Sequence, residues 1–199
     1  MATNWRQQQK AQLRERLYSV ALELFRQGGY EQTTVQQITE RAGVSKGTFF
    51  NYFPGKEHVV AEWYRRIARD ALAEVRGRRF PGAREAVSSL AQAMAAGGAA
   101  EPQLLDIKAR IVADSDLLSD AERDQDAEML AFILDRIVEG KRTDELDPDL
   151  DEKLFATLVV RTLTGTAHEW VISRHGFDLP EAVRESVFFL FRAAGRTGS

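Results

Sequence analysis

Small, hydroxyl and cationic side chains are concentrated in residues 33–56, whose sequence is TTVQQITERAGVSKGTFFNYFPGK. Residues 45–48 (SKGT) stand at the start of a short predicted helix, where free backbone N–H groups and the positive end of the helix dipole favour phosphate. Lys46 can also hydrogen-bond O6 and N7 of guanine in the major groove. Tyr52 can donate a hydroxyl hydrogen bond, and Lys56 adds a positive charge. These residue types favour binding of a nucleic acid.

Catalytic and metal-binding arrangements are not expected. Residues 168–172 (HEWVI) resemble the H-E-x-x-H motif of zinc proteases, but Ile172 stands where the second histidine ligand is required. His175 lies two helical turns after His168, which is a poor position for chelating the same metal, and His58 has no evident partner. The sequence has no cysteine, no Gly-rich phosphate loop and no G-x-S-x-G motif. We therefore expect no enzyme activity, no metal and no cofactor; hydrolysis that appears only with added zinc would contradict this.

Two short helices, expected at 35–42 and 46–52, must position the hydroxyl and cationic residues of the segment 33–56. They meet at Gly43-Val44-Ser45, where glycine allows a sharp reversal and Ser45 can cap the second helix. Helices of this length are marginal alone, so they must pack on a first helix, expected at 8–27 because its apolar residues recur at spacings of three and four. This pattern is typical of a helix-turn-helix, whose second helix enters the major groove N-terminus first. An ordinary helical hairpin is the alternative.

The ends of these elements carry recognisable signals. Gly28-Gly29 should end the first helix, since glycine accepts the left-handed conformation found there. Thr34 and Gln37 fit a capping box at the start of the next helix. Arg6 stands before the expected first helix and Lys10 in its first turn, and they form either a loose basic arm or a solvated terminus.

The remaining sequence also has helical periodicity. Residues 76–82 (RGRRFPG) are the expected linker, and Gly97-Gly98 and Gly140 are expected to separate helices. No stretch of useful length alternates between apolar and polar residues, as a strand would. An all-α fold of about nine helices follows, with the later helices expected at 56–77, 83–96, 102–113, 118–139, 149–174 and 180–194.

Charge is divided unevenly along the chain. The 199 residues carry a net charge of −3, but residues 1–56 hold eight Lys or Arg and four acids, a net +4. The remainder holds 19 basic and 26 acidic residues, a net −7. A basic head on an acidic body indicates that only the head meets a polyanion. No apolar run is long enough to span a membrane, and no signal peptide is evident, so we expect a cytoplasmic protein.

Residues 34–56 resemble the DNA-binding domain of the tetracycline-repressor (TetR) family, whose pattern is similar to T-x-x-x-I-A-x-x-A-G-V-S-x-G-T-x-Y-x-[HY]-F-x-x-K. Thr39 stands where alanine is usual, and Phe50 where tyrosine is usual, so the contact made by that tyrosine hydroxyl is not transferred to Phe50. The resemblance covers about residues 10–60. The positions that fit are Thr34, Ile38, Ala42, Gly43, Val44, Ser45, Gly47, Thr48, Tyr52, Phe53 and Lys56.

This resemblance implies a helix-turn-helix domain at 1–55 and an effector-binding and dimerisation domain at 56–199. It implies a homodimeric repressor that binds a pseudo-palindromic double-stranded operator. Thr34, Tyr52 and Lys56 would then bind phosphates, which fix register without reading sequence. Gln36 would project toward the groove, and Ser45, Lys46, Gly47 and Thr48 would line the head of the recognition helix, with Lys46 as the best candidate for base readout.

Two further surfaces are expected in the second domain. One stripe of the eighth helix and the apolar side chains of the ninth fit a dimer interface, although both helices could simply cover their own core; these residues are Leu158, Thr162, Gly165, Thr166, Glu169, Val187, Phe188 and Phe191. Met and aromatic residues suit an adaptable pocket for a hydrophobic effector. The same spacing also describes an ordinary core, and Arg110 could pair with an anionic group or form a structural ion pair. The pocket candidates are Trp63, Ile67, Met94, Leu105, Arg110, Met129, Phe132 and Ile133.

The implied mechanism is a shift between two conformations, in which an effector favours the one whose recognition helices no longer match the operator. Two alternatives remain open. A DNA-binding dimer without a small-molecule effector would have the same head, and an activator would differ mainly in where its operator lies.

Overall fold

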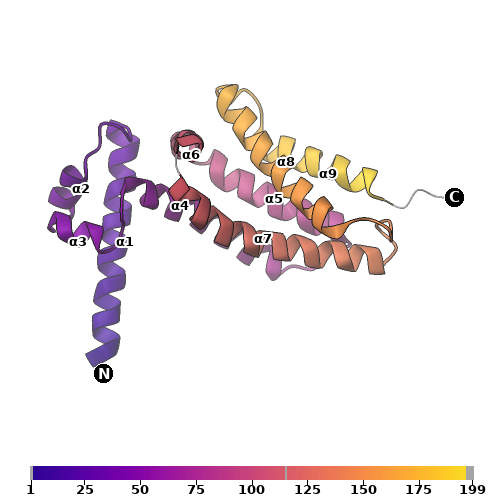
Figure 1. The fold of residues 1–199 in the computed structure, drawn as a ribbon, viewed down its shortest axis with the longest axis horizontal. Helices are drawn as coiled ribbons and strands as arrows, with labels where there is room; N and C mark the ends of the chain where they lie inside the picture. Colours follow the sequence, from indigo (N-terminus) through magenta and orange to yellow (C-terminus); the bar gives the residue numbers. More distant parts are fainter. Residues whose placement is uncertain (1, 115, 196–199) are drawn as a thin grey trace. The chain divides into compact units, whose positions relative to one another are not determined.

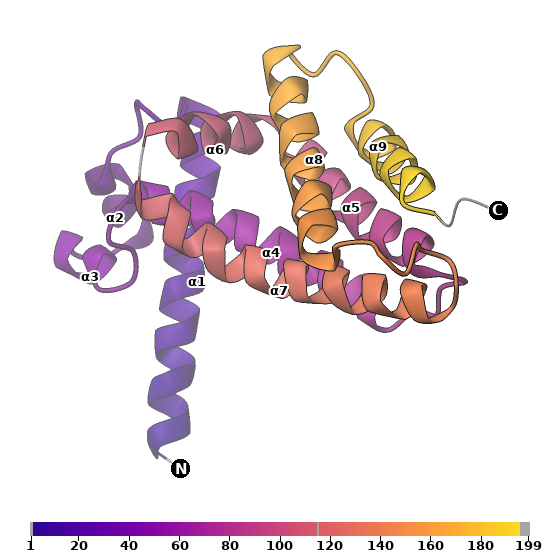
Figure 2. The ribbon, with the colours of Figure 1, turned by 45° about the vertical axis from the view of Figure 1, so that its right-hand side comes forward.

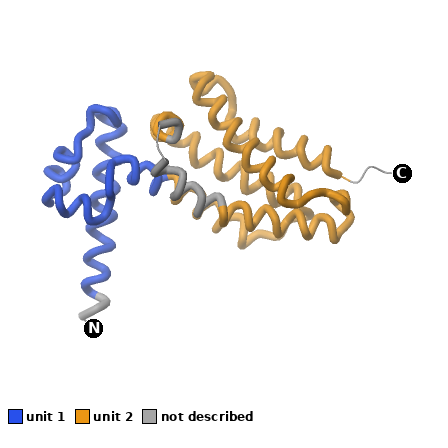
Figure 3. The backbone as a smooth tube through the Cα atoms, viewed as in Figure 1, with its two compact units in different colours: residues 1–63 blue, residues 64–199 orange. Residues whose placement is uncertain are grey.

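The computed structural model describes residues 2–114 and 116–195, and within them the chain forms nine α-helices and no β-strand (Figure 1). The all-α class expected from the sequence is confirmed. The chain divides into two compact units, residues 1–63 and residues from 64 onward (Figure 3). The division falls within α4 (Lys56–Arg76). Assignment of separate functions to 1–55 and 56–199 stays a prediction.

In the first unit α2 (Val35–Ala42) packs against the long helix α1 (Ala2–Gly28), and α3 (Lys46–Phe50) packs against α2. An ion pair between Arg14 and Glu62 joins α1 to the start of α4. Apolar side chains at helical spacing on α1 are buried, and so is a large apolar side chain from each short helix. This burial stabilises helices that are too short to be stable alone. The most deeply buried of these side chains are Leu17, Phe25, Ile38, Phe49 and Phe53.

The turn between α2 and α3 has the conformation that its residues predict. Thr34 Oγ1 accepts the Gln37 N–H at 3.2 Å, and the Thr34 N–H donates to Gln37 Oε1 at 2.7 Å, so the capping box is present. Gly43 ends α2 at φ 68°, a left-handed conformation that other residues adopt only with strain. Ser45 caps α3 by accepting the Thr48 N–H at 3.2 Å.

Two element boundaries differ from the sequence prediction. Helix α1 begins at Ala2 rather than residue 8, so Arg6 and Lys10 belong to a regular helix and not to a loose arm. No glycine or proline interrupts residues 2–13, and nothing local ends the helix there. Helix α3 ends at Phe50, because Asn51 and Tyr52 turn the chain toward Pro54.

The second unit is a four-helix bundle crossed at one end by a shorter helix. Around the bundle, α5 packs against α9, α9 against α8, α8 against α7, and α7 against α5. Helix α6 contacts α5, α7 and α8, and Figure 2 shows it across one end of the bundle. The helices are α5 (Ala83–Ala99), α6 (Pro102–Asp114), α7 (Asp116–Arg142), α8 (Glu152–Ile172) and α9 (Leu179–Ala193).

Three glycines expected between helices lie inside them instead. Gly97 and Gly98 belong to α5, and Gly140 belongs to α7. A Cβ on Gly97 would stand 2.6 Å from Cγ2 of Ile67, so this glycine permits close approach of α5 to α4 rather than a break. Among the helices of the described ranges, none is long and apolar enough to cross a membrane.

Candidate DNA-binding face and ligand pocket

The start of α3 presents small and cationic residues to solvent. Ser45, Lys46 and Gly47 are exposed, and Thr48 is half-buried. The Ser45 and Thr48 hydroxyls lie 2.9 Å apart and fix the first turn of the helix. Lys46 makes no ion pair with any residue that the structure describes. Its ammonium is therefore available to an external acceptor.

Gly47 is not required by the packing of the protein itself. A Cβ at this position would meet only Ser45 Oγ, at 3.8 Å, which is ordinary van der Waals contact. A missing side chain at an exposed helix start instead allows an external surface to come close to the backbone. Gly47 thus suits close approach of DNA to the head of the recognition helix, which it was predicted to line.

The N-cap Thr34 and the α2 residue Gln36, both predicted to meet DNA, are exposed. The Thr34 hydroxyl belongs to the capping box. Gln36 Nε2 donates to Glu40 Oε1 at 2.8 Å, one helical turn further on. Both side chains are therefore held in place at the surface, and their contacts with DNA stay predictions.

Lys56 has an internal role that the sequence did not reveal. Its ammonium donates hydrogen bonds of 2.7 Å to the carbonyl oxygens of Tyr30 and Thr33, in the loop between α1 and α2. Burial lowers the pKa of Lys56, and the negative charges of Glu31 and Glu57 oppose this shift. Lys56 therefore ties the start of α4 to that loop, and its predicted phosphate contact stays a prediction.

Tyr52 is half-buried and faces a groove shared with α1. The groove has a volume of about 340 Å³ and is also lined by Gln9, Lys10, Gln12, Leu13 and Arg16. Phe50, where the related pattern has tyrosine, is 51% exposed. The phosphate-binding role of Tyr52 stays a prediction, but two cationic side chains of α1 share its groove.

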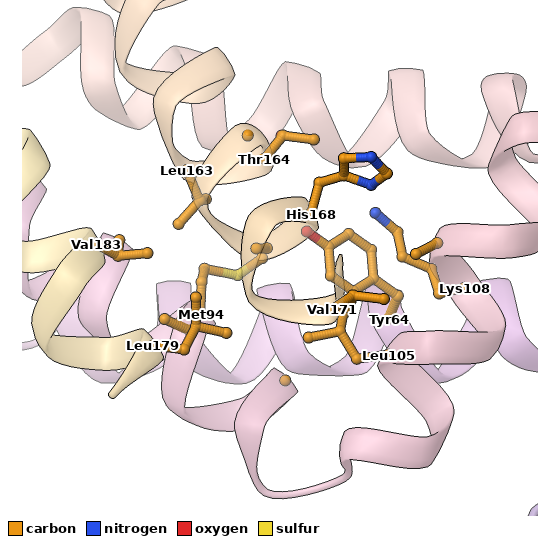
Figure 4. A pocket seen from close by; sticks show the side chains of 15 residues that line it. Tyr64, Met94, Leu105, Lys108, Leu163, Thr164, His168, Val171, Leu179 and Val183 are labelled. Carbon is orange, nitrogen blue, oxygen red and sulfur yellow. The ribbon is translucent and has the colours of Figure 1, made fainter. Parts of the chain in front are cut away.

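A separate apolar pocket of about 320 Å³ lies in the second unit. Figure 4 shows Tyr64, Lys108 and His168 gathered at one end and mainly aliphatic side chains at the other. Lys108 Nζ lies 4.0 Å from the centre of the Tyr64 ring. The lining residues come from α4, α5, α6, α8 and α9; they are Tyr64, Met94, Ala95, Gly98, Leu105, Lys108, Ala109, Leu163, Thr164, Gly165, Ala167, His168, Val171, Leu179 and Val183.

Of the predicted pocket residues, Met94 and Leu105 line this pocket. Helix α7 carries three others, but Met129 and Ile133 are buried in the bundle and Phe132 lines a different groove beside Arg136. Thus the structure does not bring these three to the pocket.

The remaining three predicted pocket residues lie elsewhere. Trp63 is buried in the first unit, and Ile67 packs against Gly97. Arg110 is exposed, and its Nε donates to the Asp106 carbonyl oxygen at 3.4 Å.

The polar end of the pocket was not predicted from the sequence. Lys108 follows Leu104 by one helical turn on α6, so a cation one turn beyond a buried leucine was the available signal. His168 was considered only as part of a zinc motif, although it stands between Thr164 and Val171 on one face of α8.

The predicted dimer residues divide into an exposed and a buried group. Leu158 is 40% exposed and Phe188 is 37% exposed, and Leu154, Ile172 and Phe189 extend this apolar surface of α8 and α9. Thr162 and Thr166 are half-buried, and Gly165 and Glu169 are exposed. Val187 and Phe191 are buried in the core of the second unit, where the rings of Phe191 and Phe155 lie 5.1 Å apart. The burial of these two residues does not support an interface role, which stays a prediction.

An exposed recognition helix, held by a capping box and a left-handed glycine turn, defines a helix-turn-helix DNA-binding protein. Comparison of the sequence and the structure with known proteins supports this class. Residues 17–63 match the sequence pattern described as "Bacterial regulatory proteins, tetR family". The first unit thus has the sequence pattern of the TetR family, and the chain is a DNA-binding transcriptional regulator.

Known relatives resemble both units of the chain. It is 26% identical to the HTH-type transcriptional repressor KstR of Rhodococcus jostii, over 81% of this chain and 74% of KstR. It is 23% identical to the fatty acid metabolism regulator protein of Bacillus subtilis, over 82% of this chain and 86% of that protein. The structure of Thermus thermophilus FadR in complex with lauroyl-CoA matches with a TM-score of 0.74 and 26% identity, covering 94% of this chain and 96% of FadR.

Proposed function

We propose that this protein is a homodimeric transcriptional repressor that an amphipathic, anionic small molecule releases from its operator. The observation that carries the proposal is the pocket of the second unit, which combines an apolar wall with a cationic end at Lys108. A repressor without an effector has no need of such a cavity, because an apolar void of this size forfeits packing.

The pocket chemistry narrows the effector class. Its volume of about 320 Å³ is at the lower end of the usual range for small-molecule sites, roughly 300–1,000 Å³. An apolar group fits against Met94 and Leu163, and an anionic group would lie at Lys108 and His168. The polar part of a larger ligand would have to extend outside. Because FadR of T. thermophilus binds lauroyl-CoA, acyl-CoA thioesters are the effector class that we propose.

The apolar surface of α8 and α9 supports the homodimer. Leu154, Leu158, Ile172 and Phe189 are each at least 40% exposed, and apolar side chains gathered on two adjacent helices mark an interaction site. Gly165 lies on the same helix and has nothing within 4 Å of the place of a Cβ, so a partner helix can approach closely. A two-fold symmetric dimer reads half-sites one helical turn apart or a multiple of it.

Release of the operator by the effector then requires that the effector prefer one conformation of the dimer. Only a difference in affinity between the two conformations shifts their populations, and DNA must weaken effector binding by the same factor. Ligand in the pocket would contact α6 and α8 at once. A change in the distance between these helices is the movement that we propose.

The test is fluorescence anisotropy with DNA from the region upstream of the gene, or with DNA selected from a random pool. Acyl-CoA thioesters from butanoyl to stearoyl are added, with free fatty acids and unacylated coenzyme A as controls. We expect selective binding that one acyl length reverses best. Lys46→Ala should remove the preference for operator over scrambled DNA, and Lys108→Met should weaken the effector response while leaving DNA affinity unchanged.

Each outcome bears on a different part of the proposal. Selective binding that none of these compounds reverses would reject the acyl-CoA class. Failure to select any DNA from the random pool would reject the regulator itself. Retained operator preference in Lys46→Ala would show that another residue reads the bases.

A further inference from the structure

The N-terminal half of α1 forms a free-standing helical segment on the first unit. Every side chain from Trp5 to Gln12 is exposed, and the first fully buried side chain is Leu17. At a rise of about 1.5 Å per residue, residues 2–13 extend about 18 Å. Figure 1 shows this part of α1 continuing past α2 and α3. Helical structure without packing is marginal in water, so a surface that covers this segment would stabilise it.

The charge of this segment has one sign. No acidic residue precedes Glu15, whereas Arg6, Lys10, Arg14 and Arg16 are cationic. Arg14 is used internally, because its guanidinium lies 3.0 Å from Glu62 and 5.0 Å from the centre of the Phe53 ring. The other three make no ion pair with any residue in the described ranges.

The cations lie on one side of the helix. Gln9, Lys10, Leu13 and Arg16 line the groove of about 340 Å³ that Tyr52 closes from the other side. Arg6 stands four residues before Lys10 and so continues the same face by one turn. We call Arg6, Gln9, Lys10 and Arg16 the α1 stripe. Three members of the stripe, all except Arg6, therefore border one groove with Tyr52, which lies two residues after the recognition helix.

We propose that the α1 stripe is a second DNA-contacting surface, which binds the phosphate backbone beside the segment contacted by the recognition helix. This inference rests on the proposed DNA-binding function and extends its contact surface. Arginine, lysine and glutamine are the side chains that commonly contact phosphate oxygens, and they contribute affinity without sequence information. A phosphate in the groove would lie between Tyr52, Lys10 and Arg16.

Other occupants fit this segment less well. A helix on an anionic membrane needs an apolar face opposite its basic one. Residues 5–12 (WRQQQKAQ) provide only Trp5 and Ala11. A polyanion without an apolar surface is the better match, and double-stranded DNA is the one that α3 also requires.

Salt dependence of operator binding tests the inference. Each neutralised phosphate contributes about 0.9 to the slope of log affinity against log salt concentration. The double variant Arg6→Ala/Lys10→Ala should thus lower the slope by about 1.8 per subunit, while preference for operator over scrambled DNA is kept. The charge-matched control is Arg69→Ala/Arg142→Ala in the second unit, where both arginines are exposed and paired with neighbouring carboxylates. The control should leave the slope unchanged.

The charge-conserving variant Arg6→Lys/Lys10→Arg keeps both positive charges, and it therefore separates the effect of lost charge from the effect of lost helix. It should keep the slope of the unmodified protein, and circular dichroism should give equal helix content for all variants. An unchanged slope in Arg6→Ala/Lys10→Ala, with selective binding intact, would overturn the α1 stripe and leave the proposed function standing. Failure of the unmodified protein to select any DNA would overturn the proposed function instead.

Trp5 provides a readout that does not depend on charge. It is 64% exposed, whereas Trp63 and Trp170 are each 5% exposed, so a neutral quencher such as acrylamide reaches mainly Trp5. Operator DNA should protect this fluorescence from quenching, and Trp5→Phe should abolish the protected component. Equal quenching of Trp5 with and without bound operator would contradict contact between this segment and DNA.

Discussion

The ammonium of Lys56 donates a 2.7 Å hydrogen bond to the carbonyl oxygen of Tyr30 and lies 4.3 Å from the centre of the Tyr30 ring. The start of α4 is thereby joined to the loop that precedes the helix-turn-helix. A residue that the sequence pattern assigns to phosphate is thus also part of the fold of the DNA-binding unit.

Replacement of Lys56 should therefore affect stability as well as DNA binding. Lys56→Ala removes two hydrogen bonds from a charged donor, and such bonds contribute about 1.5–3 kcal/mol each where water is excluded. Lys56 is only half-buried, so solvent reduces the loss. We expect the free energy of unfolding to fall by about 1–3 kcal/mol, measured by denaturant titration. Lys46→Ala is the control, since a change at an exposed position is usually within about 0.5 kcal/mol.

DNA binding by the same variant separates the two roles of Lys56. If its ammonium also contacts phosphate, Lys56→Ala should lower the salt slope by about one per subunit. A stable protein with an unchanged slope would contradict the phosphate contact. A lower slope with unchanged stability would contradict the structural role.

Gly47 and Gly43 should respond in opposite ways to alanine. At Gly47 a Cβ meets only ordinary contact, so Gly47→Ala should keep or raise stability, by up to about 1 kcal/mol, while it weakens operator binding by obstructing the DNA. At Gly43 the backbone has φ 68°, and Gly43→Ala should cost about 1–2 kcal/mol. Thermal unfolding and anisotropy measure both effects. Full operator affinity in Gly47→Ala would show that DNA does not approach this position closely.

The turn of the first unit could be predicted because its signals are local. Thr34, Gln37, Gly43 and Ser45 each act on backbone groups within a few residues, and the structure confirms their roles. The Lys56 contact could not be predicted in this way. Its acceptors lie 23 and 26 residues earlier in the chain, and only the folded unit brings them together.

The pocket was predicted less well for a different reason. Periodicity identifies which side of a helix is buried, but not whether facing side chains leave a void between them. Met94 and Met129 carry the same sequence signal, yet one lines the cavity and the other fills the core. The start of α1 was missed because residues 2–8 have no apolar face from which a helix could be recognised.

The apolar surface of α8 and α9 predicts the behaviour of dimer variants. Leu158→Glu places a charge on this surface, and we expect a monomer in sedimentation velocity with operator affinity greatly reduced. Val138→Glu is the matched control, because Val138 is 51% exposed on α7, and it should remain a dimer. A dimeric Leu158→Glu variant would place the interface elsewhere.

Phe191→Ala should instead lower stability by about 3–5 kcal/mol, as buried Phe→Ala changes do.

Filling the pocket should uncouple DNA binding from the effector. Ala109 is half-buried on α6 and lines the cavity, so Ala109→Phe places an aromatic ring where the apolar part of a ligand would lie. We expect operator affinity to be kept and the acyl-CoA concentration needed for release to rise at least tenfold, which corresponds to about 1.4 kcal/mol. Ala96→Phe, at an exposed position of α5 outside the pocket, is the control and should respond as the unmodified protein does. Unchanged release of Ala109→Phe from the operator would mean that the effector binds at another site.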